Sequence, residues 1–160
     1  MRVQATGNYD RVLYSSNIGS DIARGSGEGD ATARCDAYRM EGLTQYQDAW
    51  NVQKEMQLRR MRDADVADAA LLVEHPAVYT LGRGSTEENL KFDPECPPGG
   101  CDIHRIERGG EVTFHGPGQL VLYPILNLNR HRRDLHWYMR QCEEVRHSLS
   151  GKQGMMMSVV

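Results

Sequence analysis

The stretch that decides the fold is RGGEVTFHGPGQ, Arg108 to Gln119, which runs directly into the apolar segment LVLYPILNL. Polar and apolar side chains alternate in its middle, in the order Glu111, Val112, Thr113, Phe114 and His115. Alternation with a period of two is typical of a strand that is half buried. We therefore predict a strand with one polar face, and we expect Val112 and Phe114 to face a core on the other side.

Two glycine turns flank this predicted strand. Gly109 and Gly110 allow backbone angles closed to other residues and let a ligand approach the main chain, while the segment Gly116 to Gly118 forces a reversal beside His115. Bare backbone N–H groups near an arginine and a histidine can hold a carbonyl or carboxyl oxygen. Taken singly, a glycine pair is common in a plain turn, a histidine often makes a structural hydrogen bond, and an arginine often lies at the solvated surface. The combination favours a binding loop.

The same residues resemble the signature of a known family. RGGEVTFHGPGQLVLYPILNL resembles the long central motif of the octanoyltransferase family, also called lipoyl(octanoyl) transferase or lipoate-protein ligase B. EHPAVYTLGR, Glu74 to Arg83, resembles that family's upstream motif at the spacing the family has. DLHWYMRQCEEV, Asp134 to Val145, resembles the plant and algal branch. The resemblance covers about residues 35 to 149.

The resemblance implies an α/β fold, a mixed sheet covered by helices, like the catalytic domain of biotin and lipoate protein ligases. It implies transfer of an octanoyl group from acyl carrier protein to a lysine of lipoyl domains, the first step in making protein-bound lipoate. The implied partners are octanoyl-acyl carrier protein, the lipoyl domains of 2-oxoacid dehydrogenase E2 subunits and the glycine cleavage H protein. No cofactor or metal is implied. The residues expected to line the acyl pocket are Arg108, Gly109, Gly110, Glu111, Val112, Thr113, Phe114 and His115.

The family's chemistry uses a cysteine thiolate that takes the acyl chain from a thioester and passes it to an amine, while a lysine moves protons. The family carries these residues in a K-[IL]-x-[AS]-[IL]-G segment and near a P-C-G turn. The last stretch, SGKQGMMMSVV, departs from both patterns. We therefore assign no catalytic residue, neither Lys152 nor any cysteine, and expect the C-terminal part of the domain to be missing and the chain alone not to complete the transfer.

The residues alone leave two other functions open. One is an ATP-dependent lipoate or biotin ligase of the same fold, which needs a phosphate-binding loop; the segment GRGS at 82–85 is too weak a match to predict one. The other is a non-catalytic fragment that binds acyl groups or lipoyl domains. The HGPGQ motif favours the transferase over the ligase, and the missing Lys and Cys segments favour the fragment over a working enzyme.

Composition limits the class of protein. The chain has 160 residues, a formal charge of -3 and 39% hydrophobic residues, which indicates one domain or part of one. We expect no nucleic-acid partner, because the charge balance is not basic, and no membrane partner, because no apolar run is long enough to span a bilayer. The four cysteines lack regular spacing and are typical of reduced thiols. Cys96 and Cys101 lack two further obvious ligands, so no metal site is predicted.

We divide the chain into three parts. Residues 1–33 are rich in Gly, Ser and Asp and are predicted to be a disordered or targeting extension, although their acids are unlike an ideal transit peptide. Residues 34–149 form the N-terminal part of the octanoyltransferase domain, and 150–160 form a divergent tail. The plant branch implies a plastid or mitochondrial location, and a bacterial origin would imply the cytoplasm.

The remaining elements follow from local signals. A strand is predicted from Cys35, then a helix that starts at a capping box formed by Thr44 and Gln47. That helix is expected to bury an incomplete stripe and to end in a solvated arginine group: Tyr46, Ala49, Trp50, Met56 and Met61, then Arg59, Arg60 and Arg62. Strands are predicted at 69–74 and 77–81, separated by the break at His75-Pro76, and a loop is predicted at 82–98.

The last two predicted elements follow the central motif. Residues 120–128 are apolar on both faces and are predicted to be an interior strand in which Pro124 requires a bulge or an edge. Asp134 is the expected N-cap of a final helix. Its apolar stripe is predicted to lie in the core against the sheet, with Cys142 as a buried, unreactive thiol: Leu135, Tyr138, Met139, Cys142, Val145 and Leu149.

Overall fold

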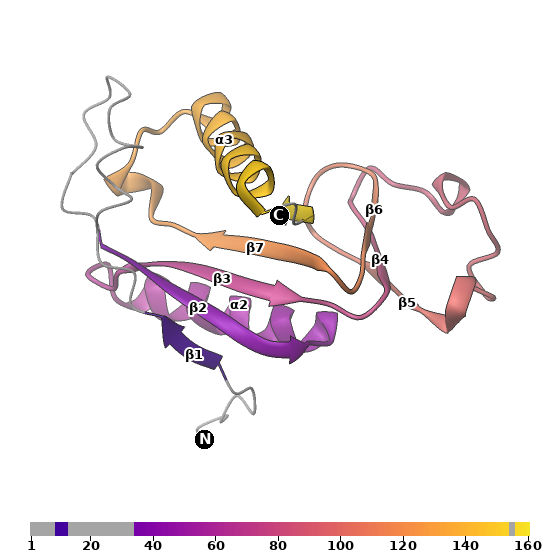
Figure 1. Cartoon of the computed structure of the whole chain (residues 1–160). Coiled ribbons are helices and arrows are strands. Elements are labelled where there is room, and N and C mark those ends of the chain that lie inside the picture. The colour runs from indigo at the N-terminus through magenta and orange to yellow at the C-terminus, as the bar shows by residue number, and fades with distance from the viewer. Residues whose placement is uncertain (1–8, 13–33, 154–155) are drawn as a thin grey trace.

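The structure, a computed structural model, describes residues 9–12, 34–153 and 156–160, with side chains described for 34–147 and 156–160. The strands and helices, in chain order, are β1 (Tyr9–Val12), β2 (Cys35–Leu43), α2 (Tyr46–Arg62), β3 (Asp68–Glu74), β4 (Val78–Leu81), β5 (Asp102–Arg105), β6 (Val112–His115), β7 (Gln119–Ile125), α3 (Leu135–Gln153) and β8 (Met156–Val159). Short 3-10 turns occupy Glu87–Asn89, Pro98–Gly100 and Leu128–Arg130. The predicted α/β class is confirmed (Figure 1).

The larger sheet has five strands in the order β1-β2-β3-β7-β8. It is mixed, because β2 runs parallel to β3 and β7 parallel to β8, whereas β3 and β7 are antiparallel. Helix α2 crosses one face of this sheet (Figure 1). The apolar residues between them are buried and form the core: Met40, Ala49, Val52, Leu71, Val73, Val121 and Tyr123. Burial of this apolar surface is the main contribution to the stability of the fold.

The smaller sheet has three strands in the order β5-β4-β6 and lies at one end of the larger sheet (Figure 1). In sequence it is inserted between β3 and β7. Strand β4 runs parallel to β5 and antiparallel to β6, so residues directly opposite one another share a face of the sheet. Thr80 lies opposite His104 and Thr113 on one face, and the next row pairs Tyr79 with Phe114 on the other.

The predicted capping box at the start of α2 is wrong. The helix begins at Tyr46, its N-cap is Gln45, and no side chain of the described residues caps it. The backbone of Thr44 is held by the end of β3 instead, since its N–H donates to the Glu74 carbonyl at 2.8 Å and its carbonyl accepts from His75 Nδ1 at 2.8 Å. Tertiary hydrogen bonds therefore determine where this helix begins.

The buried face of α2 also differs from the predicted stripe. Tyr46 and Ala49 are buried as expected, but the third buried residue of this helix is Val52. The Met61 side chain is 82% exposed, so its predicted burial is wrong. The Met61 side chain therefore lies at the surface.

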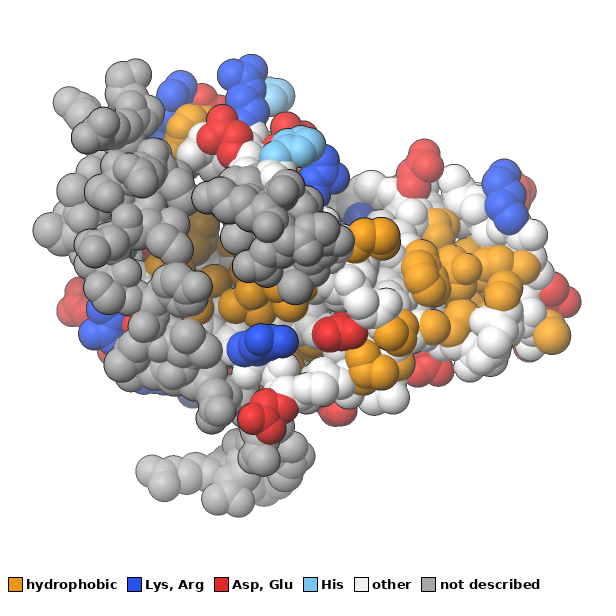
Figure 2. All heavy atoms as spheres, in the orientation of Figure 1, with side chains coloured by type: hydrophobic (Ala, Val, Ile, Leu, Met, Phe, Trp, Pro, Cys, Tyr) orange, Lys and Arg blue, Asp and Glu red, His pale blue; other side chains and the backbone are white. Residues whose placement is uncertain are grey.

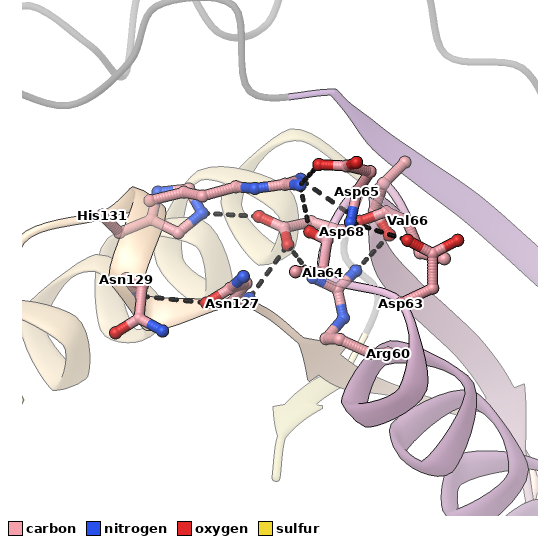
Figure 3. A network of polar contacts seen from close by, with 11 residues as sticks. Arg60, Asp63, Ala64, Asp65, Val66, Asp68, Asn127, Asn129 and His131 are labelled. Carbon is pink, nitrogen blue, oxygen red and sulfur yellow. Dashed lines mark hydrogen bonds and ion pairs between the residues drawn. The ribbon is translucent and has the colours of Figure 1, made fainter.

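Arg60 is not part of a solvated arginine group, as the sequence suggested. Its side chain is 10% exposed and forms an ion pair with the buried carboxylate of Asp68 (Figure 3). The other Asp68 oxygen accepts from His131 Nε2 at 2.5 Å, and the Asn127 backbone N–H donates to Asp68 Oδ1 at 2.9 Å. This Asp68 network ties the end of α2 to the start of β3 and to the connection before α3.

Strand β7 is interior, as predicted, with β3 on one side and β8 on the other. Among the described residues, β8 pairs with Gln119 to Leu122 of β7. Pro124 lies beyond that pairing, where β3 is the one neighbour of β7 among the described residues, which confirms the predicted edge position. β8 belongs to the tail that has no match in the family pattern, and no strand was anticipated there. Of the extension 1–33, the structure describes only β1, which pairs with β2.

Asp134 caps α3 as predicted, because its carboxylate accepts from the Trp137 backbone N–H at 3.1 Å. The predicted core stripe is wrong for Leu135 and Met139, which are 69% and 53% exposed. In the described part of the chain this helix contacts chiefly β8, which follows it, and Leu135 and Met139 lie near its other end. Cys142 is half-buried and not buried as predicted; burial raises the pKa of its thiol, and its low reactivity stays a prediction. Neither described helix combines the length and apolar character needed to cross a membrane.

Candidate functional site

Arg108 is clamped by two threonines from neighbouring strands of the small sheet. Its Nη2 donates to Thr113 Oγ1 at 2.6 Å and to Thr80 Oγ1 at 3.2 Å, and its Nη1 donates to the Gly109 carbonyl at 2.9 Å. Thr80 and Thr113 lie opposite each other in the ladder, which is why one guanidinium reaches both. The Nε atom of Arg108 is buried and has no hydrogen-bond partner among the described residues. The clamp therefore leaves the buried Nε–H without an acceptor from the described residues.

The glycine pair after Arg108 packs against the segment that follows β4. Gly110 has φ of +92°, which L side chains rarely adopt, and a Cβ there would lie 3.0 Å from Arg108 Nη1. Gly82 lies against this turn so closely that a Cβ on Gly82 would be 2.2 Å from the Gly110 carbonyl oxygen. The Arg83 backbone N–H donates to the Arg108 carbonyl at 2.9 Å. The turn is thus held by backbone contact.

His115 is fully buried at the junction of the two sheets. Its Nδ1 lies 2.6 Å from Gln119 Oε1. Because an amide oxygen only accepts, Nδ1 carries the proton, and Nε2 is left as an acceptor. Nε2 is buried and has no partner within the described part of the chain. The site therefore contains a free buried acceptor as well as a free buried donor.

A second buried histidine lies next to His115. The His75 and His115 ring centroids are 5.9 Å apart. His75 Nδ1 donates to the Thr44 carbonyl, so its Nε2 accepts from the Tyr123 hydroxyl at 2.9 Å. The centroid of the Tyr46 ring lies 5.6 Å from the His75 ring centroid and 4.9 Å from that of His104, and the ring planes are tilted. These rings form one aromatic wall of the junction.

The structure brings together only part of the predicted pocket residues. Arg108, Thr113 and His115 share the inner face of the small sheet, and Gly109 and Gly110 form the turn beside them. Glu111 is exposed, and the Val112 and Phe114 side chains belong to the opposite face.

The expectation that Phe114 faces a core is wrong, because its side chain is 48% exposed. Its ring packs on Tyr79, with centroids 5.1 Å apart, and Tyr79 packs on Phe92. Figure 2 shows hydrophobic side chains gathered on the surface of this part of the molecule. The polar face is the buried one, because it packs against the end of the large sheet, where His75 and Tyr123 lie.

Sequence reasoning missed the residues that support the site from other strands: Glu74, His75, Thr80, Gly82, Gln119 and Tyr123. In the local sequence signal His75 only ends a strand, although it lies in EHPAVYTLGR, which carries the family resemblance. The resemblance was therefore the one available signal for this segment.

Burial sets the protonation of both buried histidines. It lowers the pKa of His75 and of His115 below the ordinary value of 6.5, and the positive charge of Arg108 lowers the pKa of His115 further. Burial also raises the pKa of the Tyr123 hydroxyl, so this group keeps its proton and donates to His75. Both rings are therefore neutral near pH 7, which agrees with Nε2 of His115 acting as an acceptor.

Stability is expected to fall as the pH drops below about 6.5. Both histidines have folded-state pKa values below the unfolded value, so the unfolded chain binds more protons in this range, and protonation favours unfolding. Each histidine contributes a slope of at most about 1.4 kcal/mol per pH unit. Urea unfolding between pH 7.5 and 5 measures this, and His75→Gln should reduce the slope. An equal slope in parent and variant would contradict the assignment.

The chain matches the family model described as "Lipoyl protein ligase A/B catalytic domain" over residues 45–153. It is 59% identical over 104 residues to an octanoyltransferase of Synechococcus elongatus, which is 65% of this chain and 44% of the relative. It is 55% identical over 105 residues to an octanoyltransferase of Nostoc punctiforme, 66% of this chain and 45% of the relative. A chloroplastic octanoyltransferase of Arabidopsis thaliana is 44% identical over 117 residues, 70% of this chain and 41% of the relative. The chain thus spans less than half the length of these relatives, and the family model shows that it belongs to the lipoyl protein ligase A/B catalytic domain family.

Proposed function

We propose that this chain carries the acyl-binding part of an octanoyltransferase. The reaction moves an octanoyl group from acyl carrier protein to a lysine of a lipoyl domain, such as those of 2-oxoacid dehydrogenase E2 subunits and the glycine cleavage H protein. The names of the relatives support this proposal. The chloroplastic relative supports a plastid location over a mitochondrial one.

The observation that carries the proposal is the pair of unpaired buried atoms, Arg108 Nε and His115 Nε2. A buried polar group without a partner costs about 1–3 kcal/mol, so a ligand that supplies both partners offsets that cost. An acyl carbonyl accepts from the Arg108 donor. The His115 acceptor takes an N–H donor, which the target amine provides. The glycine turn beside Arg108 leaves the main chain accessible to the acyl group.

The second candidate is an ATP-dependent ligase, because the matched family model covers ligases A and B together. Such an enzyme takes free octanoate and ATP in place of a thioester. A non-catalytic acyl-binding fragment is the third. All three functions require an acyl pocket at Arg108 and His115. They differ in the acyl donor, a thioester or free octanoate with ATP, and in whether an acylated product is released.

The test is octanoyl binding by the purified chain, measured by calorimetry with an amide analogue of octanoyl-acyl carrier protein in one arm and octanoate with ATP in the other. Gly110→Ala is expected to weaken binding of the analogue about tenfold or more, because the added Cβ presses on Arg108 Nη1. Gly99→Ala is the matched control, since Gly99 has φ of +67° and no described atom lies within 4 Å of an added Cβ.

Both substitutions place alanine at positive φ and are expected to lower the melting temperature to a similar extent. Only Gly110→Ala should change the affinity. Equal affinity in both variants, or a folded parent chain that binds no octanoyl ligand, would contradict the proposed pocket. Tighter binding of octanoate with ATP than of the analogue would favour the ligase.

A further inference from the structure

Glu74 connects strand β3 to the turn that precedes strand β7. It is the last residue of β3 and lies opposite Leu120 in β7. Its side-chain Oε1 accepts from the Gly118 backbone N–H at 2.7 Å, across 44 positions of sequence. A hydrogen bond from a backbone N–H to a carboxylate is stronger than one between neutral groups. The turn from Gly116 to Gly118 is therefore fixed to the large sheet by a charge-assisted bond.

This turn determines where Gln119 lies. Gly118 has φ of +84°, and the Gln119 backbone N–H donates to the Gly116 carbonyl at 3.1 Å, which closes the turn. Gln119 is the next residue after the Glu74 contact, and its side-chain oxygen is the acceptor for His115 Nδ1. The contacts therefore run without a gap from Glu74 through the Gly118 turn to Gln119 and then to the imidazole.

We infer that Glu74 is a positioning residue that acts through the Gly118 turn and Gln119 to keep the proton of His115 on Nδ1, which leaves Nε2 as the acceptor of the site. The role of Nε2 toward a ligand rests on the proposed function. The effect on the imidazole itself does not, because it concerns only the tautomer of a buried ring.

The geometry gives Glu74 this role because the turn is exposed on its outer side. Pro117 and Gly118 are exposed, so water competes for the Gly118 N–H once the carboxylate is removed. A turn that moves takes Gln119 out of hydrogen-bond range of Nδ1, since the two atoms are only 2.6 Å apart and hydrogen bonds weaken steeply with distance. The neutral ring then has no fixed tautomer, and Nε2 carries the proton in part of the population.

The test compares three substitutions by NMR of the imidazole nitrogens. Glu74→Gln keeps a side-chain oxygen at the same reach and should retain the Nδ1–H tautomer. Glu74→Ala removes the acceptor and should give a mixture of tautomers at His115. Glu74→Asp keeps the charge but shortens the side chain by one methylene, and it should give the same mixture. Glu88→Ala is the control, because Glu88 is an exposed acid outside the site.

The affinity for the amide analogue of octanoyl-acyl carrier protein is measured on the same samples. Glu74→Ala and Glu74→Asp are expected to weaken it about tenfold, the effect of losing one hydrogen bond, while Glu74→Gln and Glu88→Ala stay near the parent. A general loss of stability would lower the melting temperature without changing the tautomer of the folded ring. If Glu74→Ala does not fold, the Glu74→Asp and Glu74→Gln pair gives the same comparison.

The inference is overturned if His115 keeps the Nδ1–H tautomer in Glu74→Ala or in Glu74→Asp. The outcomes also separate it from the proposed function. A tautomer change in a chain that binds no octanoyl ligand supports the positioning role and contradicts the acyl pocket. An unchanged tautomer in a chain that binds the ligand contradicts the positioning role and leaves the pocket in place.

Discussion

Gly82→Ala is expected to displace the turn at Gly109-Gly110 and to abolish measurable octanoyl binding. An added Cβ would lie 2.2 Å from the Gly110 carbonyl oxygen, 2.9 Å from its carbon and 3.1 Å from the Arg108 carbonyl oxygen. All three are backbone atoms, so no side-chain rotation relieves the overlap. Overpacking of this kind costs about 1–3 kcal/mol, and here the strain falls on the residues that hold the Arg108 guanidinium.

The matched control is Gly84→Ala, two residues further along. Its Cβ would meet the same Gly110 oxygen at 4.0 Å, which is an ordinary contact. Chemical denaturation and calorimetric affinity of the two variants measure the difference. We expect Gly84→Ala to match the parent in both. If Gly82→Ala binds ligand as well as Gly84→Ala does, the turn tolerates displacement and Gly82 has no part in shaping the site.

Asp68→Ala is expected to give the largest loss of stability in the described part of the chain. The Asp68 side chain is 2% exposed and pairs with Arg60, which is 10% exposed. Removing one partner of a buried ion pair costs about 3–5 kcal/mol, because the other charge stays buried without compensation. His131 Nε2 and the Asn127 backbone N–H lose their acceptor as well. Urea denaturation monitored by circular dichroism measures the change in unfolding free energy.

Glu107→Gln provides the comparison, since it breaks an ion pair on the surface. Lys54 Nζ lies 3.1 Å from Glu107 Oε2, and the two side chains are 38% and 70% exposed. The expected change is within about 0.5 kcal/mol, as for most exposed pairs. Equal effects of the two substitutions would show that the Asp68 network adds no more to stability than a solvated contact.

Sequence reasoning succeeded where the signal was local. Strands β3 and β7 follow from apolar runs bounded by His75-Pro76 and the Gly116–Gly118 turn, and the N-cap at Asp134 follows from a side chain three residues before its Trp137 donor. The alternation at Val112 to His115 correctly gave a strand with two distinct faces. Signals within a few residues were sufficient in these cases, because the interactions that form a turn or an N-cap join residues that are close in sequence.

The missed features depend on contacts between distant parts of the chain. Which face of β6 is buried depends on His75 and Tyr123, whose own hydrogen bond spans 48 positions. Thr44 carries a capping signal, yet its backbone is used by the end of β3. In the sequence, Arg60 cannot be told from any other arginine near a helix end, because only the fold brings Asp68 beside it. Periodicity and capping rules contain no information on such pairings.

The small sheet is inserted into the large sheet at one point of the sequence, between β3 and β7. Glu74 and Leu120 are direct neighbours across β3 and β7, so the chain leaves and re-enters the large sheet at a single point. A tight turn would be enough to join these two strands, and the entropy of closing a longer connection grows only slowly with its length. The large sheet and α2 contain the hydrophobic core, and the inserted lobe at 78–115 carries the Arg108 turn. A change in the length of this lobe therefore leaves the pairing of β3 with β7 in place, but it must preserve the contacts of Tyr46 with His104 and of Lys54 with Glu107 that join the lobe to α2.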